Sequence, residues 1–228
     1  MAVMAFRTLA LGAALACALP AAALAEYAVI GDSLGVGVSW AAKPQVTFAK
    51  NSVAIHGGAI LEQINRLPRG VTAFMSLGTN DAVGGAVDVK KPVQAILAAA
   101  AARDVKLVWL GPPCVFKSWD KYAKELDANL RALLKGTSVI YVGMQDAEVC
   151  NPSLRGREGV HFTMAGYTVM WRKAAEAAGF PIVVASNEKL ASLRDGQKKR
   201  SSPRRHRKRK PPSLIAPARK PEAAPGAL

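Results

Sequence analysis

Strand-like and helix-like segments alternate along the chain from Tyr27 to Ala178. Short apolar runs such as residues 71–77 predict strands that are buried on both faces of a sheet. Alanine-rich segments with helical spacing of their apolar residues, such as residues 89–103, predict helices. Strands that alternate with helices favour right-handed βαβ units. We therefore predict an α/β fold, a three-layer α/β/α sandwich with a mostly parallel sheet of about five strands.

The expected elements follow one another closely, and Gly or Pro marks many of their ends. Strands are expected at residues 27–30, in a second region at 46–49 and 52–55, and at 71–77, 105–110 and 139–142. Helices are expected at residues 34–42, 60–67, 89–103, 120–134 and 164–178.

The chain divides into one domain and two appendages. Its 228 residues, 50% of them hydrophobic, are enough for one globular domain, which we place at residues 26–185. The formal net charge of +15 comes largely from residues 198–210, which hold nine Lys or Arg residues and no acid. Residues 186–228 lose the apolar periodicity and are rich in Lys, Arg, Pro and Ala, which predicts a disordered basic tail.

Residues 1–25 have the layout of a secretory signal peptide. Arg7 precedes an apolar run at residues 9–19, and an Ala-Leu-Ala sequence at residues 23–25 forms a cleavage site. The apolar run is too short to favour a membrane span. We therefore expect a periplasmic or secreted protein, with lipid anchoring at Cys17 as the alternative.

Cys114 and Cys150 remain once this leader is removed. In an oxidising compartment an even pair of cysteines predicts a disulfide, and two buried free thiols are the alternative.

The stretch from Tyr27 to Gly35 places a serine where a nucleophile would be effective. The first strand ends at Gly31 and a helix follows, so Ser33 lies at a strand's carboxyl end, where open α/β sheets bind ligands. The amide groups and the positive dipole end of that helix would lie behind the serine. Helix capping by Asp32 and Ser33 is the alternative.

Other polar residues are expected at the same edge of the sheet. Gly57 follows the second strand region, Asn80 the third strand, and His161 the segment after the fifth. Acyl transfer needs a nucleophile, a base and donors for the negative oxygen of the tetrahedral intermediate. Gly57 suits a donor because its backbone can approach a substrate closely, and Asn80 offers a side-chain amide.

His161 is the best candidate for the base among the three histidines. His206 lies inside the basic tail, and His56 has no acid next to it in the sequence, although it is expected to line the pocket. Glu158 precedes His161 by three residues, so its carboxylate can reach Nδ1 in one tight turn. A helix-capping or core histidine is the alternative.

With these residues the chain resembles the SGNH or GDSL hydrolases. Four sequence blocks occur in the family's order: Gly31-Asp32-Ser33-Leu34, the Gly57 region, Gly78-Thr79-Asn80-Asp81, and residues 158–163. The resemblance implies a flavodoxin-like sandwich and ester hydrolysis without metal or cofactor. It also implies Ser33 as nucleophile and His161 as base, with an oxyanion hole formed by the Ser33 amide, Gly57 and Asn80.

Two features leave alternatives open. The family usually has aspartate where this chain has Glu158, so a triad with a longer acid and a weaker Ser–His dyad are both possible outcomes. Gly58 is an alternative donor to Gly57. A non-catalytic module that binds the cell envelope is the alternative to an esterase.

The loop after the fourth strand carries Phe116 and Trp119, which are candidates for contacting an acyl chain or a sugar ring. Packing within the loop is the alternative. The sequence shows no long apolar insertion that would form a lipid lid, which favours short acyl groups such as acetyl on cell-envelope glycans. A lysophospholipase or thioesterase remains an alternative.

Other classes of function have little support in the sequence. Gly31, Gly35 and Gly37 do not form the dinucleotide fingerprint, there is no phosphate-binding Gly-Lys-Ser/Thr, and no two histidines stand at metal-ligand spacing. The basic tail predicts salt-sensitive attraction to anionic envelope polymers or lipid headgroups, with a solvated extension as the alternative. Nucleic acid is not an expected partner of an exported chain.

Overall fold

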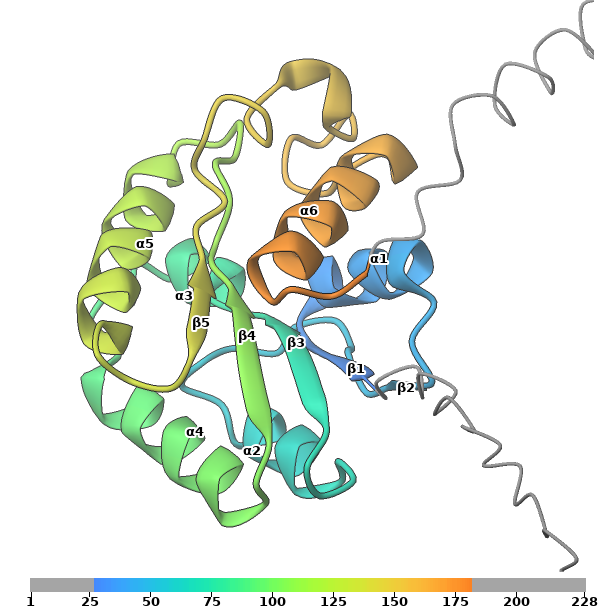
Figure 1. Ribbon diagram of the computed structural model, residues 1–228. Coiled ribbons are helices and arrows are strands. Elements are labelled where there is room, and N and C mark those ends of the chain that lie inside the picture. The colour runs from blue at the N-terminus through green and yellow to red at the C-terminus, as the bar shows by residue number, and fades with distance from the viewer. Residues whose placement is uncertain (1–26, 182–228) are drawn as a thin grey trace, which may run out of the picture. The chain divides into compact units, whose positions relative to one another are not determined.

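A parallel five-stranded sheet with helices on both faces forms the centre of the computed structural model, which describes residues 27–181 (Figure 1). The strands lie in the order β2-β1-β3-β4-β5, and every neighbouring pair is parallel. Their bounds are Tyr27–Gly31 (β1), Val46–Thr47 (β2), Thr72–Ser76 (β3), Lys106–Leu110 (β4) and Ile140–Val142 (β5). The predicted fold class is confirmed.

The helices form the two outer layers. Their bounds are Ser33–Ala42 (α1), Gly58–Asn65 (α2), Thr79–Val83 (α3), Lys90–Ala102 (α4), Asp120–Leu134 (α5) and Met164–Ala177 (α6), with a 3₁₀ turn at Pro152–Leu154. Helices α1 and α6 share one hydrophobic cluster, whereas α2, α4 and α5 contribute to the other. Phe74 and Met75 are adjacent on β3 and both are fully buried, because each points into a different layer.

The strand order reverses direction between β1 and β3. The chain moves outward from β1 to β2, then returns past β1 to form β3, β4 and β5. In doubly wound sheets of this order, ligands bind in the crevice at the carboxyl ends of the strands on either side of the reversal. Ser33 follows β1 and Asn80 follows β3, so both lie beside this crevice.

The second strand region is shorter than predicted, and the expected strand at residues 52–55 is wrong. The chain runs beside β1 through Lys50, whose amide donates to the Gly31 carbonyl at 3.1 Å. It then turns at Ser52, which has a φ of 62°. The Asp81 carboxylate accepts the amides of Ile55 (2.8 Å) and His56 (3.2 Å), so a side chain replaces the neighbouring strand as hydrogen-bond partner.

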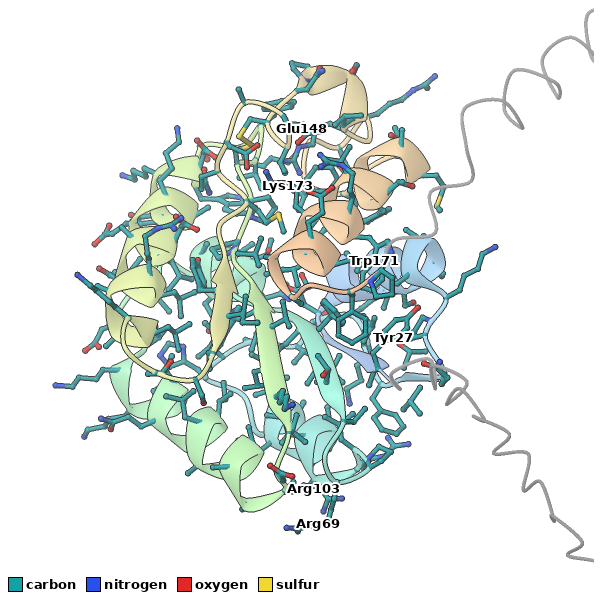
Figure 2. The ribbon with its side chains drawn as sticks, viewed as in Figure 1. Tyr27, Arg69, Arg103, Glu148, Trp171 and Lys173 are labelled. Atoms are coloured by element: carbon teal, nitrogen blue, oxygen red, sulfur yellow. A yellow bond between two sulfur atoms is a disulfide. The ribbon has the colours of Figure 1, made fainter. Side chains whose placement is uncertain are left out.

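An aromatic cluster attaches the middle of α6 to the start of β1. Tyr27 and Trp171 stack with their ring centroids 5.3 Å apart (Figure 2). Both rings pack against Phe74, and the Tyr27 ring also packs against Phe180. The Tyr27 hydroxyl also donates to the Ala42 carbonyl at the end of α1, at 2.6 Å. This cluster holds α1 and α6 against the same face of the sheet.

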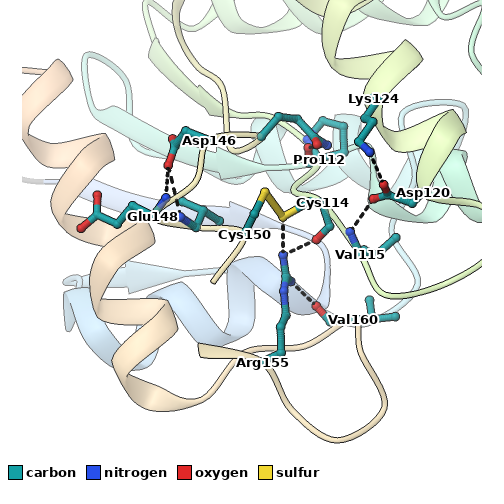
Figure 3. The surroundings of a disulfide bond; sticks show 12 residues. Pro112, Cys114, Val115, Asp120, Lys124, Asp146, Glu148, Cys150, Arg155 and Val160 are labelled. Atoms are coloured by element: carbon teal, nitrogen blue, oxygen red, sulfur yellow. Dashed lines mark hydrogen bonds and ion pairs between the residues drawn. A yellow bond between two sulfur atoms is a disulfide. The ribbon is translucent and has the colours of Figure 1, made fainter. Parts of the chain in front are cut away.

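The predicted disulfide between Cys114 and Cys150 is present (Figure 3). It joins the segment after β4 to the segment after β5, and the two cysteines are 36 residues apart in sequence. Closing a loop of this length stabilises a fold by about 3–4 kcal/mol.

The predicted leader (residues 1–25) and basic tail (residues 186–228) lie outside the described residues, as do Cys17 and His206. Among the helices of residues 27–181, none has the length and apolar character needed to span a bilayer.

Replacing Gly31 by alanine should destabilise the protein severely. Gly31 has a φ of +113°, and a Cβ there would lie 1.9 Å from the Ser76 carbonyl oxygen. We expect Gly31→Ala to lower the free energy of unfolding by about 3–5 kcal/mol, measured by urea denaturation. Gly70→Ala is the matched control, because Gly70 also has a positive φ (+75°) but its Cβ would meet only Asp104 Oδ2 at 3.8 Å. A loss of about 1–2 kcal/mol is expected for the control, and equal losses would contradict the steric argument.

Candidate active site

Ser33 begins α1 directly after β1, and Asp32 supplies the helix cap. Asp32 Oδ1 accepts the amides of Leu34 at 3.0 Å and Gly35 at 3.3 Å. Because Asp32 fills the capping role, the Ser33 side chain is free for another contact. The alternative left open by the sequence, that Ser33 is also a cap, has no support in these contacts.

The Ser33 hydroxyl contacts His161, although 128 residues separate the two in sequence. Ser33 Oγ lies 3.0 Å from His161 Nε2, and His161 Nδ1 lies 2.7 Å from Glu158 Oε1. Glu158 is an acceptor only, so the ring carries its hydrogen on Nδ1 and leaves Nε2 to accept from the serine. Serine, histidine and carboxylate therefore form one continuous hydrogen-bonded chain.

Glu158 makes this contact in spite of its longer side chain. Its carboxylate folds back on its own turn, where Oε1 accepts the His161 amide at 2.7 Å and Oε2 accepts the Val160 amide at 2.8 Å. Partial burial opposes ionisation of Glu158, but the hydrogen bonds from Val160 and His161 hold the pKa of the carboxyl below its usual value. The extra methylene relative to aspartate is thus accommodated without losing the contact to His161.

Backbone and amide donors lie at the same edge of the sheet. Within residues 27–181, neither the Ser33 amide at the start of α1 nor the Gly58 amide at the start of α2 has a hydrogen-bond acceptor. The Gly57 amide, in contrast, donates to the Ala54 carbonyl at 3.1 Å. This turn favours Gly58 over Gly57 as an oxyanion donor. Asn80 donates one amide hydrogen to the Val53 carbonyl at 2.8 Å, which leaves its second hydrogen for a ligand.

Two buried polar residues that hold the site were missed by the sequence reasoning. Gln63 on α2 accepts the Gly31 amide at 2.6 Å and donates to the Gly31 carbonyl at 3.1 Å. Asp81 holds the chain just before Gly57 through Ile55 and His56. A signal for Gln63 was present in the sequence, because it falls on the apolar stripe of its helix between Ile60 and Ile64.

His56 is engaged in its own loop. Its Nδ1 lies 2.8 Å from Asp81 Oδ1 and its Nε2 lies 3.1 Å from the Asp88 carbonyl oxygen. The hydrogen bond to Asp81 raises the pKa of His56 above its usual value. Both ring nitrogens face acceptors, so these contacts give His56 a structural role and leave its predicted contact with substrate unsupported.

The two aromatic candidates differ in exposure. Phe116 is 49% exposed, and its amide donates to the Gly159 carbonyl at 2.8 Å, so it lies next to the turn that carries Glu158. Trp119 immediately precedes α5 and packs against the core. Phe116 is therefore exposed to a ligand, whereas Trp119 is half-buried against the core.

No protein-family model matches the sequence, and no curated protein is similar enough to match it. Solved structures with the same arrangement include the C-terminal catalytic domain of peptidoglycan O-acetyltransferase A from Streptococcus pneumoniae, an extracellular lipase from Streptomyces rimosus and a GDSL-like lipase from Bacteroides thetaiotaomicron. Their TM-scores are 0.53, 0.51 and 0.51, at 19%, 15% and 15% sequence identity. The superpositions cover 69%, 65% and 68% of this chain and 94%, 99% and 88% of theirs.

The chain has the SGNH-hydrolase fold. At these identities the likeness establishes the fold alone, and the chemistry of the site depends on its own side chains. On this SGNH-type sheet, a serine in contact with a histidine, which in turn contacts a carboxylate, is an arrangement suited to nucleophilic attack on a carbonyl. Within residues 27–181, no three His, Cys, Asp or Glu side chains gather as metal ligands would.

Asp32, next to the serine, is fully buried in the SGNH-type core. Its Oδ1 accepts from Ser76 Oγ at 3.2 Å as well as from the α1 amides, but its Oδ2 has no partner among residues 27–181. Burial raises the pKa of Asp32 to about 7. The hydrogen bonds to Asp32 favour its ionised form and lower the pKa, but the effect of burial is larger. The carboxyl therefore exchanges its proton near neutral pH.

This burial predicts a pH dependence of stability. Between about pH 4 and pH 7 the folded state holds more protons at Asp32 than the unfolded chain, so stability falls as pH rises through this range. Asp32→Asn keeps an acceptor for the α1 amides but does not titrate. We expect the unfolding free energy of the wild type to fall relative to Asp32→Asn from pH 4 to pH 7, by on the order of a few kcal/mol, and to level off above pH 7.

Urea denaturation at several pH values measures this difference. Glu125→Gln on the exposed surface of α5 is the control, and its difference from the wild type should change little. A constant difference between the wild type and Asp32→Asn across the range would show that folding does not raise the pKa of Asp32.

Proposed function

We propose that this protein is an exported serine esterase that cleaves carboxylic esters through an acyl-enzyme on Ser33. The observation that carries the proposal is the hydrogen-bonded chain from Ser33 Oγ to His161 Nε2 (3.0 Å) and from His161 Nδ1 to Glu158 Oε1 (2.7 Å). A capping or core histidine would have no need of both contacts.

The proposed reaction has two halves. Ser33 Oγ attacks the carbonyl carbon while His161 Nε2 takes the hydroxyl proton, and the tetrahedral intermediate then collapses as His161 gives that proton to the leaving alcohol oxygen. In the second half a water molecule loses a proton to His161 and attacks the acyl-Ser33 carbon. Collapse of the second intermediate releases the acid and returns the proton to Ser33. Glu158 keeps the imidazole oriented and stabilises its charged form.

The negative oxygen of each intermediate needs donors that are already in place. We propose the Ser33 amide, the Gly58 amide and the free Asn80 amide hydrogen for this role. The first two are supported by their position at helix N-termini, where unpaired amides and the helix dipole favour negative charge. Gly57 remains the alternative if its turn with Ala54 opens when substrate binds.

The openness of the site supports short acyl groups carried by a large polymer. The side chains of His161 and Glu158 are 46% and 48% exposed, so the acyl group of a bulky glycan can reach Ser33 without entering a deep cavity. One structure of the same fold is a peptidoglycan O-acetyltransferase domain, which adds support for acetyl groups on cell-envelope glycans. We propose such acetyl esters as the substrate class.

One observation favours a second substrate class. Phe116 is 49% exposed beside Gly159, and it offers an apolar surface to a longer acyl chain. This would suit a lysophospholipase or thioesterase of the same fold.

Export rests on the leader-like sequence at residues 1–25. We also propose that the basic run at residues 198–210 attracts the protein to anionic envelope polymers or lipid headgroups.

The esterase proposal is tested by removing the serine hydroxyl. Ser33→Ala should lower kcat/KM for p-nitrophenyl acetate by on the order of 10⁴-fold or more, because nucleophile and base act as a unit. Glu158→Gln should lose less, since the contact between Ser33 and His161 persists. Ser39→Ala on the same helix is the control and should match the wild type, because among residues 27–181 Ser39 Oγ donates only to the Val36 carbonyl of its own helix. Equal rates for wild type and Ser33→Ala would refute the mechanism, and an inactive wild type would favour the non-catalytic module.

The acyl group is identified by a series of p-nitrophenyl esters from acetyl to palmitoyl, run beside O-acetylated glycans. We expect kcat/KM to be highest for acetyl and the acetyl value to change by less than about threefold in Phe116→Ala, because one methyl group offers little apolar surface for a ring to contact. A maximum at long chains that is lost in Phe116→Ala would select the lysophospholipase or thioesterase alternative.

A further inference from the structure

Glu158 and His161 lie on one short hairpin, residues 155–162, which we call the His161 hairpin. Arg155 and Phe162 form an antiparallel bridge at its base, and the Gly156 amide donates to the His161 carbonyl at 2.7 Å. Its tip is a tight turn in which the Gly159 amide donates to the Gly156 carbonyl at 3.0 Å. The position of His161 relative to Ser33 therefore depends on where this hairpin sits as a unit.

The Arg155 side chain links the hairpin to the disulfide (Figure 3). Its Nη1 donates to the Val160 carbonyl at 2.8 Å, next to His161, while its Nη2 donates to the Cys114 carbonyl and lies 3.2 Å from Cys114 Sγ. The guanidinium also lies over the ring of Phe162, with Cζ 3.5 Å from the ring centroid. One side chain thus contacts both the disulfide and the residue preceding His161.

Burying the charged side chain of Arg155 costs desolvation free energy that packing alone would not require. It is only 7% exposed, it forms no ion pair with a carboxylate among residues 27–181, and its Nε has no partner there. Burial lowers the pKa of Arg155 to about 10, so it is still charged at neutral pH. A methionine would fill similar space without the cost of desolvating a cation. The two carbonyl contacts are what the guanidinium adds.

The segment on the other side of this link is itself held firmly. Cys114 is bonded to Cys150, the Val115 amide donates to Asp120 Oδ1 at 2.7 Å, and the Phe116 amide donates to the Gly159 carbonyl at 2.8 Å. A Cβ on Gly159 would lie 3.0 Å from Phe116 Cβ, so hairpin and segment are in close contact at this point. The disulfide segment is thus a fixed support against which the hairpin can be placed.

We propose that Arg155 is a positioning residue that places the His161 hairpin against the Cys114–Cys150 disulfide and so sets the contact between His161 and Ser33. Its catalytic consequence rests on the proposed esterase function, whereas its effect on the His161 ring does not. A misplacement of about 1 Å can cost up to about 10²-fold in rate, so a link of this kind matters even though it touches no substrate.

The test compares Arg155→Met with Arg157→Met. Arg157 lies on the same hairpin but is exposed, which makes it a matched control. With p-nitrophenyl acetate, we expect Arg155→Met to lower kcat by about 10–100-fold and to change KM by less than about threefold, and Arg157→Met to stay within about twofold of the wild type. Equal kcat values for the two variants would overturn the proposal.

A second readout does not depend on activity. Ring ¹⁵N chemical shifts of His161, assigned by comparison with His161→Gln, report which nitrogen carries the hydrogen. The wild type and Arg157→Met should show the hydrogen on Nδ1, and Arg155→Met should show both tautomers. If this change is seen but the wild type hydrolyses no ester, the positioning role stands and the proposed function fails. An unchanged His161 ring in Arg155→Met overturns the positioning role.

If Arg155→Met does not fold, the Arg155→Lys variant tests the positioning role instead. Lysine keeps the charge but places it on a single nitrogen, without the rigid fork whose Nη1 and Nη2 reach the two carbonyls, so a kcat loss of about 10-fold is expected, with no change in Arg157→Lys. Wild-type kcat and an unchanged His161 ring in Arg155→Lys would overturn the proposal.

The link to the disulfide has its own test. Replacing Cys114 and Cys150 by alanine should lower kcat. We expect the fold-loss of kcat in the wild-type background to be more than about threefold larger than the fold-loss in the Arg155→Lys background. If removing the disulfide lowers kcat by the same factor in both backgrounds, Arg155 does not act through the disulfide.

Discussion

The position of Ser33 depends on the close contact between Gly31 and Ser76 at the ends of β1 and β3. The Asp32 amide donates to the Ser76 carbonyl at 2.9 Å, and only a residue without a Cβ fits beside that carbonyl. Gln63 satisfies the other backbone groups of Gly31 from α2. Because β1 and β3 flank the point where the strand order reverses, this contact places the start of α1 beside the crevice of the sheet.

The candidate site is assembled from two local structures that packing brings together. One is the N-terminus of α1, where Asp32 caps the helix and leaves Ser33 free. The other is the His161 hairpin, whose backbone bonds orient Glu158 and His161 before any distant residue is involved. Helices α1 and α6 lie side by side on one face of the sheet (Figure 1), and this packing closes the 3.0 Å contact between Ser33 and His161.

Much of this arrangement was predictable because it depends on local patterns. Apolar runs and helical spacing gave nearly all the elements, and the three-residue spacing of Glu158 and His161 was enough to predict their contact. Both errors arise because a hydrogen bond to one particular partner, rather than a periodic pattern, fixes the backbone there. The strand expected at residues 52–55 is absent because Asp81, 26 residues after Ile55, supplies hydrogen bonds that a strand would otherwise provide. The Gly57 amide, expected to be free, is used in a turn with Ala54.

The sequence by itself determined the layer order, the serine at a strand end and the histidine with its carboxylate, since each follows from periodicity or from spacing within one turn. Only the tertiary structure decided that Asp32 rather than Ser33 caps α1, that Gly58 has the free amide, and that Arg155 joins the hairpin to the disulfide. Each of these three outcomes depends on a hydrogen bond between one group and one particular partner. Such pairings produce no periodic pattern in the sequence from which they could be predicted.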